Sequence, residues 1–194
     1  MKNSIILKTD EELKIVMSPI RQKIIKTLNR EGRPVTSKYI ADKLSISPSS
    51  AQHHISKLQQ IGVVEFSHSE IINGINAKYL KLTDKTISIG HDISDDLTAE
   101  RDILSRNILS NAYSEFNNII NTQRKLLKEE YKKGNKMADQ LSGVVHLTTE
   151  DANKLFDLID DFIKSHSNAT KNSHPYEYAL IAFRADLANN AEKE

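Results

Sequence analysis

The stretch that decides the fold is TSKYIADKLSISPSSAQHHISKLQQIG, residues Thr36 to Gly62. It predicts two short helices joined by a tight turn. Thr36 is expected to cap the first helix, because its hydroxyl can accept a hydrogen bond from an unpaired backbone N–H group of the first turn. Ser47 followed by Pro48 predicts the start of the second helix, since the N–H that Pro lacks is not needed there. Gly62 is expected to end that helix.

Apolar residues recur at helical spacing in both predicted helices, which indicates one shared core. The inward-facing set is Ile40, Ala41, Leu44, Ile46, Ala51, Ile55 and Leu58. The second helix carries small and polar residues on its other side, a pattern that core packing alone does not require. A helix of this kind, held by a helix-turn-helix core, can enter the major groove of DNA.

After Gly62 the pattern changes from helical to strand-like, with Val63 to Phe66 rich in β-branched and aromatic residues. Asn73-Gly74 is a strong signal for a tight hairpin turn. The returning strand is expected to include Tyr79 to Leu82 and to end near Asp84. This hairpin is predicted to be a wing beside the second helix.

Two further helices are expected ahead of this motif. One begins at the acidic residues 10–12 and continues to Ser18-Pro19, and the next covers Ile20 to Arg30. The apolar run Ile5 to Leu7 can form a short strand or an arm that packs on a partner subunit, and both alternatives stay open at this point.

Residues 10–85 resemble the winged-helix DNA-binding domain of ArsR-like regulators. The segments that carry the resemblance are IADKLSISPSSAQHHISKLQQIGVVE and, in the wing, INGINAKYLKLT. The resemblance implies a transcriptional regulator, with repression more common than activation. It also implies that Arg21, in the opening Ser18-Pro19-Ile20-Arg21, lies near the DNA backbone.

Helical phase divides the second helix into a buried and a DNA-facing side. Gln52 can pair with adenine through its amide, and His53 can donate to guanine or phosphate. Lys57 is expected to contact phosphate, whereas His54 is expected to be partly buried and bonded to a carbonyl. Wing residues Ser67 and Asn76 can also reach the DNA backbone or the minor groove. The predicted DNA-binding residues are Arg21, Lys38, Ser47, Ser49, Ser50, Gln52, His53, Ser56, Lys57, His68, Asn73 and Lys78.

Charge is distributed unevenly, although the net charge is +1. Residues 1–92 hold 14 Lys and Arg against 9 Asp and Glu, and residues 93–194 hold 13 against 17. By itself, an excess of basic residues can simply reflect a solvent-exposed surface. Beside a helix-turn-helix, the basic half favours contact with DNA phosphates.

The second half of the chain predicts an almost wholly helical dimerisation region. A helix capped by Ser94-Asp95-Asp96 and running to about Lys133 would span roughly 60 Å, which is too long for a small monomeric domain to bury. A strand over Val144 to Leu147, a helix capped by Thr148 or Thr149, and a last helix over Tyr176 to Ala191 are also expected. The fold class is therefore mainly α with a β-hairpin wing. The predicted domains are a winged helix-turn-helix over 1–92 and a helical region over 93–194.

Several classes of function are disfavoured by the sequence. The chain has no Cys, so the thiolate metal sites of many ArsR-like proteins cannot form. His91-Asp92 has no second His in the helix that follows, and neither a metal nor another cofactor is expected. No catalytic motif, signal peptide or membrane span is recognised, and a cytoplasmic location is expected.

The leading hypothesis is a homodimeric, sequence-specific repressor that reads a pseudo-palindromic operator in double-stranded DNA with residues 48–61 in the major groove. The alternative is a winged helix that serves as a protein-interaction or scaffolding module and assembles through the long helix. The second half can also hold a small-molecule effector, or it can serve only to join two subunits.

Overall fold

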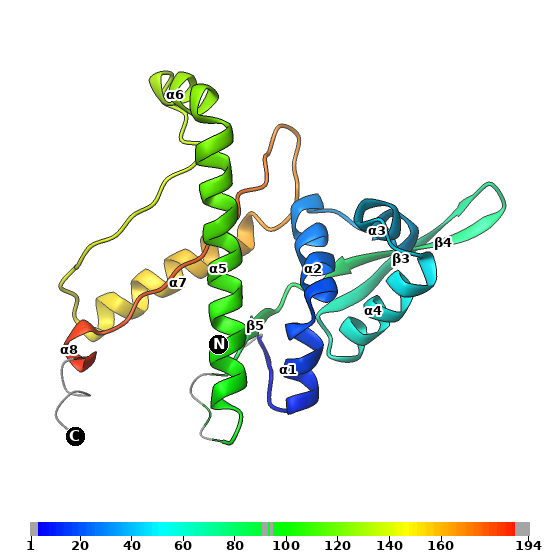
Figure 1. The fold of residues 1–194 in the computed structure, drawn as a ribbon, viewed down its shortest axis with the longest axis horizontal. Helices are drawn as coiled ribbons and strands as arrows, with labels where there is room; N and C mark the ends of the chain where they lie inside the picture. The colour runs from blue at the N-terminus through cyan, green and yellow to red at the C-terminus, as the bar shows by residue number, and fades with distance from the viewer. Residues whose placement is uncertain (1–3, 91–92, 94, 189–194) are drawn as a thin grey trace. The chain divides into compact units, whose positions relative to one another are not determined.

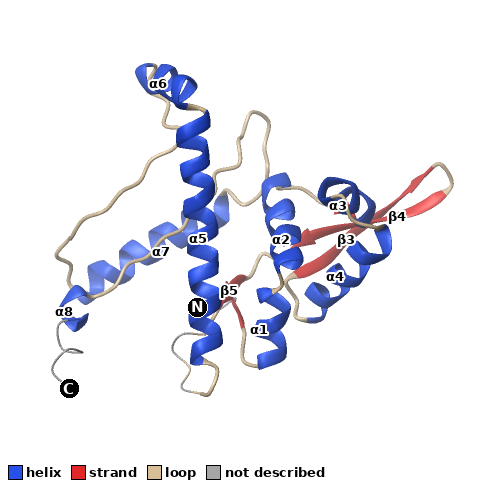
Figure 2. Ribbon diagram, viewed as in Figure 1, coloured by secondary structure: helices blue, strands red, loops and turns tan. Residues whose placement is uncertain are grey.

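The computed structural model describes residues 4–90, 93 and 95–188. Figures 1 and 2 show the order of its helices and strands. The chain divides into two compact units, one of Met1–Asn107 and Gln140–Pro175, the other of Ile108–Asp139 and Tyr176–Glu194. The sequence instead places one boundary after residue 92. Assigning separate functions to residues 1–92 and 93–194 therefore stays a prediction.

The N-terminal helices are those that the sequence predicts. They are α1 (Asp10–Met17), α2 (Pro19–Glu31), α3 (Ser37–Leu44) and α4 (Pro48–Gln60). The Thr36 hydroxyl accepts a hydrogen bond from the backbone N–H of Tyr39 at 3.1 Å. The Ser47 hydroxyl accepts one from Ser50, also at 3.1 Å. Both predicted caps are therefore confirmed, and Gly62 follows the end of α4 with a left-handed φ of 73°.

The predicted wing is also present, as an antiparallel pair of β3 (Val64–Ile72) and β4 (Ile75–Leu82). Asn73 and Gly74 form its turn with φ values of 51° and 79°. Two successive positive φ values are the geometry that makes Asn-Gly a hairpin signal. A short strand β2 (Val35–Thr36), which the sequence does not predict, pairs with β4 and gives the strand order β2-β4-β3.

The helix-turn-helix and the base of the wing share one hydrophobic core. Its buried members include Ile24, Ile40, Ile55, Val63 and Leu80, which come from α2, α3, α4 and the wing. One side of α4 is buried against residues of α2, α3 and the wing. This packing fixes the orientation of α4.

A second, smaller core lies around α1. Leu7, Leu13, Val16 and Leu104 are buried in it. Leu104 belongs to α5 (Thr98–Thr122), so this cluster attaches the start of α5 to the N-terminal helices.

The N-terminal run includes a short strand, one of the two alternatives that the sequence left open. β1 (Ser4–Ile6) pairs in parallel with β5 (Thr86–Ser88), a strand that the sequence does not predict. Arg101 of α5 is buried nearby, and its Nε donates to the carbonyl of Ile89 at 2.9 Å. Its guanidinium also pairs with both carboxylate oxygens of Asp95.

The predicted long helix is interrupted. α5 ends at Thr122, and α6 (Arg124–Lys132) begins after Gln123, whose φ and ψ are −111° and 18°. The Thr122 hydroxyl donates to the carbonyl of Asn118 at 2.7 Å. Side-chain bonds of this kind compete with the helical backbone pattern and bend helices. At the start, Ser94 lies outside the described residues, and Asp95 accepts from the Leu97 N–H before α5 begins at Thr98.

Two other expectations for the second half are wrong. Residues 144–147 are not a strand, because no other described segment pairs with them. Residues 176–184 are not helical, and only α8 (Ala185–Ala188) forms there, while residues 189–191 of the expected helix lie outside the described range. An amphipathic helix needs a surface on which to bury its apolar face, and Tyr178, Ile181 and Phe183 are exposed. α7 (Thr149–Ser165) forms as predicted, with Thr148 as its cap.

Candidate nucleic-acid interface

Helix α4 presents the polar face that the sequence predicts. Ala51, Ile55 and Leu58 are fully buried, and the opposite side carries exposed polar residues. The exposed predicted residues of α4 are Ser49, Gln52, His53 and Ser56. Because these four lie on one side of a helix whose other side is fixed in the core, they form a single polar surface.

Hydrogen bonds within α4 hold part of this surface in place. The Ser56 hydroxyl donates to the Gln52 carbonyl at 2.9 Å. The Gln52 side-chain amide lies 3.4 Å from the same hydroxyl, a long contact that leaves the amide able to turn toward a base edge. The Ser47 and Ser49 hydroxyls lie 3.0 Å apart at the start of the helix. Backbone N–H groups of the first turn of a helix favour anions such as phosphate.

His53 and His54 have different environments although they are adjacent. His53 is exposed, and its ring meets that of His54 edge to face at 5.3 Å. His54 is partly buried, as predicted, but its Nδ1 has no hydrogen-bond partner among the described residues. Burial lowers the pKa of His54, and the positive charge of Arg21 lowers it further. The lowered pKa favours the neutral form of His54, which suits its partly buried position. The side chain of His53 is instead exposed to solvent.

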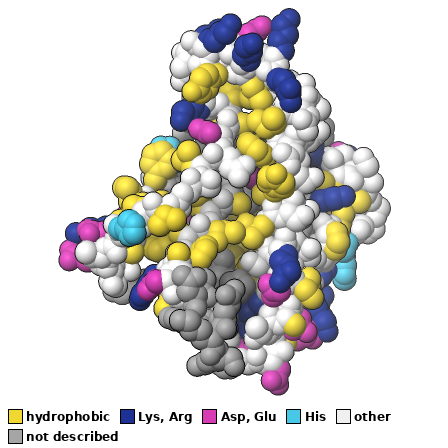
Figure 3. Space-filling model, turned by 60° about the vertical axis from the view of Figure 1, so that its left-hand side comes forward, with side chains coloured by type: hydrophobic (Ala, Val, Ile, Leu, Met, Phe, Trp, Pro, Cys, Tyr) yellow, Lys and Arg dark blue, Asp and Glu magenta, His cyan; other side chains and the backbone are white. Residues whose placement is uncertain are grey.

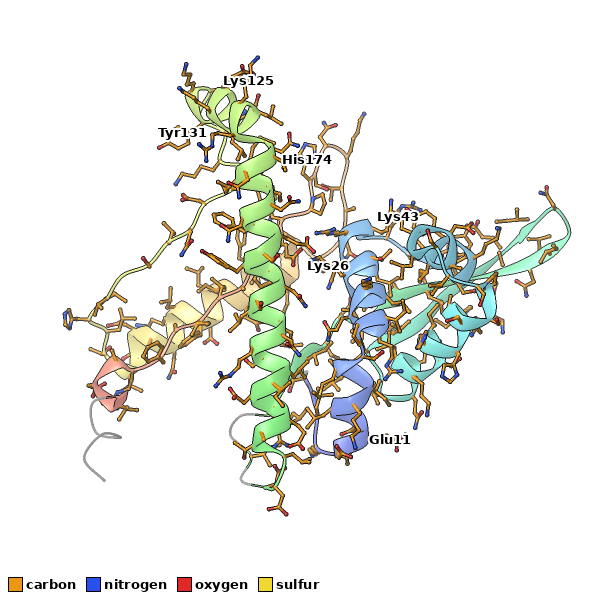
Figure 4. All side chains as sticks on the ribbon, in the orientation of Figure 1. Glu11, Lys26, Lys43, Lys125, Tyr131 and His174 are labelled. Carbon is orange, nitrogen blue, oxygen red and sulfur yellow. The ribbon has the colours of Figure 1, made fainter. Side chains whose placement is uncertain are left out.

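The predicted phosphate contacts already hold protein partners. Arg21 donates to the carbonyls of Lys14 and Ile15, and so ties α2 to the end of α1. Lys57 lies 3.7 Å from the carboxylate of Glu11, which is labelled in Figure 4. The contact of Arg21 and Lys57 with DNA stays a prediction, and for Arg21 the structure shows a structural role that the sequence did not reveal.

The two lysines of α3 differ in their ion pairing. Lys38 pairs with Asp42 one turn later, at 3.2 Å. Lys43, also labelled in Figure 4, is exposed and makes no ion pair with any residue that the structure describes. Exposed pairs of the Lys38–Asp42 kind contribute about 0–1 kcal/mol, so exchange of the carboxylate for a phosphate costs little.

The two faces of the wing are chemically different. Side chains alternate along a strand, and the register places Ser69 opposite Lys78 and Ile71 opposite Asn76. We call the side turned toward α4 the groove face; it carries Phe66, Ser69, Ile71, Asn76, Lys78 and Leu80. The outer face carries His68, Glu70, Ile72, Ile75 and Tyr79.

Most polar groups of the outer face are bonded to one another. The ring of His68 stacks on Tyr79 with centroids 4.5 Å apart, and its Nε2 lies 3.3 Å from the carboxylate of Glu70. The same carboxylate accepts from the Tyr79 hydroxyl and raises the pKa of that phenol. His68 and Lys78 therefore lie on opposite faces, and the structure does not bring these two predicted residues together. A contact of either with DNA stays a prediction, as it does for Asn73 in the turn.

A groove lies between α4 and the groove face of the wing, with a volume of about 360 Å³. It is lined by Gln52, Gln59, Phe66, Ser69, Lys78 and Leu80. Of these residues, Gln52 and Lys78 are among the contacts that the sequence predicts, whereas Gln59, Phe66 and Ser69 are not. Helical phase places Gln59 two turns after Gln52 and on the same side, so this residue could have been found from the sequence.

In the described part of the chain, no group of three or more His, Asp or Glu side chains is arranged to hold a metal ion. His91 and Asp92 lie outside the described residues. Among the helices of the described residues, none combines the length and the hydropathy needed to cross a bilayer.

Comparison with known proteins supports the class of the N-terminal domain. Residues 16–65 match a protein-family model described as a helix-turn-helix domain. The fold of residues 10–85 and this match define a winged helix-turn-helix domain, the class of DNA-binding domain found in transcriptional regulators. The ArsR-like resemblance is in keeping with this class, whose members are generally not enzymes.

Similar solved structures have low sequence identity. Reduced HlyU from Vibrio cholerae N16961 is 18% identical, with a TM-score of 0.32, and the alignment covers 50% of this chain and 83% of HlyU. A transcriptional regulator homologue from Pyrococcus horikoshii OT3 is 19% identical, with a TM-score of 0.32 and coverage of 57% and 98%. Apo ZitR from Lactococcus lactis, solved as a mutant, is 13% identical, with a TM-score of 0.31 and coverage of 77% and 83%. No curated protein sequence matches the chain.

Proposed function

We propose that this protein is a cytoplasmic transcriptional regulator that binds a pseudo-palindromic operator as a homodimer and represses by occupying it. The observation that carries the proposal is the polar side of α4, where Ser49, Gln52 and His53 are exposed while Ala51 and Ile55 are fully buried. A helix fixed in this way can present side chains to base edges at a constant depth in the major groove.

The second half of the chain supports a homodimer. α6 and α7 bury none of their residues, and Figure 3 shows hydrophobic side chains at many points of the surface. The exposed apolar residues of this half include Ile108, Ile119, Leu126, Leu155, Phe156 and Phe162. Large exposed apolar surfaces mark interaction sites, and a second copy of the chain would supply the two-fold symmetry that a pseudo-palindromic operator requires. A small effector bound in this half would provide regulation.

The direct test is selection of bound duplexes from a random-sequence pool with the full-length protein at moderate salt. A recovered sequence with two related half-sites is expected, centred about one helical turn apart. Recovery of no preferred sequence would overturn the proposal. A protein that binds no duplex but captures another protein would support the scaffolding alternative.

Variants then assign the roles of individual residues. Gln52→Ala and His53→Ala are expected to relax base preference at particular positions, each by about 1–3 kcal/mol of discrimination. Lys57→Ala is expected to weaken all sequences alike and to lower the salt dependence. Lys125→Ala is the control for Lys57→Ala, because it removes the same charge from α6, outside the helix-turn-helix, and it is expected to leave DNA affinity unchanged. Equal effects of the three α4 variants on every sequence would contradict these roles.

A further inference from the structure

Helix α6 carries exposed cations that have no carboxylate partner in the part of the chain that the structure describes. These unpaired cations are Arg124, Lys125, Lys128 and Lys132. Figure 3 shows Lys and Arg side chains gathered over this helix. The next lysine differs, because Lys133 pairs with Glu130 at 2.7 Å. The unpaired cations of α6 are therefore available to an anionic surface.

Helical phase places two of these cations beside an exposed aromatic ring. At about 100° per residue, Arg124, Lys128 and Tyr131 fall within one arc of about 60°. Tyr131 is 69% exposed. Lys125, which is labelled with Tyr131 in Figure 4, lies about 120° away from it around the helix. We call Arg124, Lys128 and Tyr131 the α6 face.

Helix α7 has the opposite charge in a similar pattern. Asp157 and Asp161 are exposed and make no ion pair or hydrogen bond with any residue that the structure describes. Leu158 and Phe162 follow them directly in the chain and are 67% and 64% exposed. We call these four residues the α7 face. The other carboxylates of α7 are paired with lysines of the same helix, and they are Glu150, Asp151 and Asp160.

The two faces match in spacing as well as in charge. Each helix has its two unpaired charges four residues apart, which is about 6 Å along the helix axis. If α6 lies along α7, both cations can meet both carboxylates while Tyr131 packs on Leu158 or Phe162. An apolar centre with a charged rim is the common composition of a protein–protein interface.

We infer that the α6 face of one subunit binds the α7 face of a second copy of the chain. The inference rests on the proposed function and specifies the contact that forms its homodimer. α6 and α7 belong to different compact units and bury none of their residues, so both faces are available to another subunit. Two-fold symmetry forms the contact twice, because each subunit supplies one α6 and one α7. This contact differs from a seam in which the two copies of α5 pair with each other.

A second copy is the favoured partner because it carries the complementary face in equal number. Duplex DNA or an anionic membrane would neutralise the cations of α6. Neither would cover the exposed Leu158 and Phe162 of α7 or pair with its carboxylates. A contact between two subunits accounts for the unpaired charges of both helices.

The test reverses the charges of one face at a time and measures self-association of the full-length protein by sedimentation equilibrium. The double variants are Arg124→Glu/Lys128→Glu for the α6 face and Asp157→Lys/Asp161→Lys for the α7 face. Loss of one exposed ion pair weakens association by a factor of about two to three. Each double variant breaks two pairs in each of two contacts, so the dissociation constant of the dimer is expected to rise about thirtyfold.

Lys125→Glu/Lys132→Glu is the matched control. It makes the same change of charge on the same helix, from exposed and unpaired positions outside the α6 face. Its dissociation constant is expected to stay within about threefold of wild type, since charges outside the contact are screened by salt. Circular dichroism would check that every variant keeps its helices.

Mixing the two reversed proteins distinguishes a contact between subunits from a contact within one chain. In a mixed dimer, one contact joins two reversed faces and the other joins two native faces, so opposite charges meet in both. The mixture is therefore expected to associate about as tightly as wild type, whereas each reversed protein alone does not.

Each other outcome overturns a defined part of the reasoning. Reversals that weaken association no more than the control overturn the pairing of α6 with α7, also if they lower DNA affinity, and leave the homodimer in place. Recovery only when both faces are reversed in one chain places the contact within a subunit and overturns the inference. A wild type that stays monomeric at every concentration, with or without its selected duplex, overturns both the contact and the proposed homodimer. Recovery in the mixture by a protein that selects no duplex supports the contact and overturns the proposed DNA binding alone.

Discussion

A small apolar cluster helps to attach α5 to the N-terminal helices, beside the hydrogen bonds of Arg101, and Leu104→Ala tests the contribution of the cluster. Leu104 is 1% exposed and packs with Leu7, Leu13 and Val16. Among the residues that the structure describes, these four are the buried members of the cluster, so the loss of one large side chain removes a substantial part of it. Truncation of a buried Leu to Ala typically costs 2–5 kcal/mol, because the lost apolar burial is joined by the cost of the cavity.

The expected cost lies in the lower half of that range, at about 2.5 kcal/mol, because a small cluster near the surface can partly collapse into the space. For a unit of this size, each kcal/mol lowers the melting temperature by roughly 3–5 °C. The melting temperature of Leu104→Ala should therefore fall by roughly 8–12 °C, measured by thermal unfolding and checked by urea denaturation.

Ile103→Ala is the matched control, since Ile103 precedes Leu104 on α5 and is 49% exposed. Its expected cost is within about 0.5 kcal/mol. Both variants should be measured at several protein concentrations, because the loss of a dimer contact depends on concentration whereas the loss of packing within one chain does not. If Ile103→Ala destabilises as much as Leu104→Ala at every concentration, the role given to this cluster is refuted.

Three further changes test other local features. Gly74→Ala should destabilise by about 1 kcal/mol in urea denaturation, because its φ of 79° is unfavourable for a residue with a Cβ; an unchanged midpoint would contradict this view of the turn. Ser47→Ala should cost about 1 kcal/mol through loss of the cap of α4, and Ser47→Asp should restore most of it, so failure of that rescue would argue against capping. Arg101 lowers the pKa of Asp95 below its ordinary value of 3.8, so this pair should stabilise the fold above pH 4 and lose its contribution as the pH falls through the lowered pKa. Asp95→Asn should flatten the acid limb of stability measured against pH, and an unaltered acid limb would show that the pair does not matter.

The helix-turn-helix and the wing could be predicted because their signals are local. Thr36, Ser47 and Pro48 act within one helical turn, and Asn73-Gly74 acts within one hairpin. Each signal requires only neighbouring residues to be correct, so a single sequence is enough to recognise it.

The features that the sequence does not predict depend on residues far apart in the chain. Ser4 pairs with Thr86 in the β1–β5 ladder. Neither segment has a sequence pattern that indicates which strand it pairs with. Arg101 lies on a helix of mixed polarity, where an Arg is normally solvated; its burial follows from the carbonyls of Leu7 and Ile89, which only the fold brings within reach.

The candidate interface could be predicted on α4 but only in part on the wing. Helical phase separates Gln52 from Ile55 without any knowledge of tertiary structure. On the wing, the register shift between Phe66 and His68 decides which residues share a face, and a bulge of this kind has no clear sequence signal. The sequence therefore placed His68 and Lys78 in one set of candidates although they lie on opposite faces.

If α4 binds DNA as proposed, the distribution of charge around this helix limits how the protein can gain sequence specificity. Lys38 and Lys57 have carboxylate neighbours in Asp42 and Glu11, and these carboxylates would also lie near bound DNA and reduce the local positive potential. Non-specific affinity comes mainly from phosphate neutralisation, so a surface with few unpaired cations binds random sequences weakly at moderate salt. Discrimination by amide and hydroxyl groups is unaffected by this reduction. In the proposed complex, the arrangement that weakens binding to all DNA would therefore increase the relative contribution of Gln52 to recognition, and it would favour a regulator that binds only where the matching site is present.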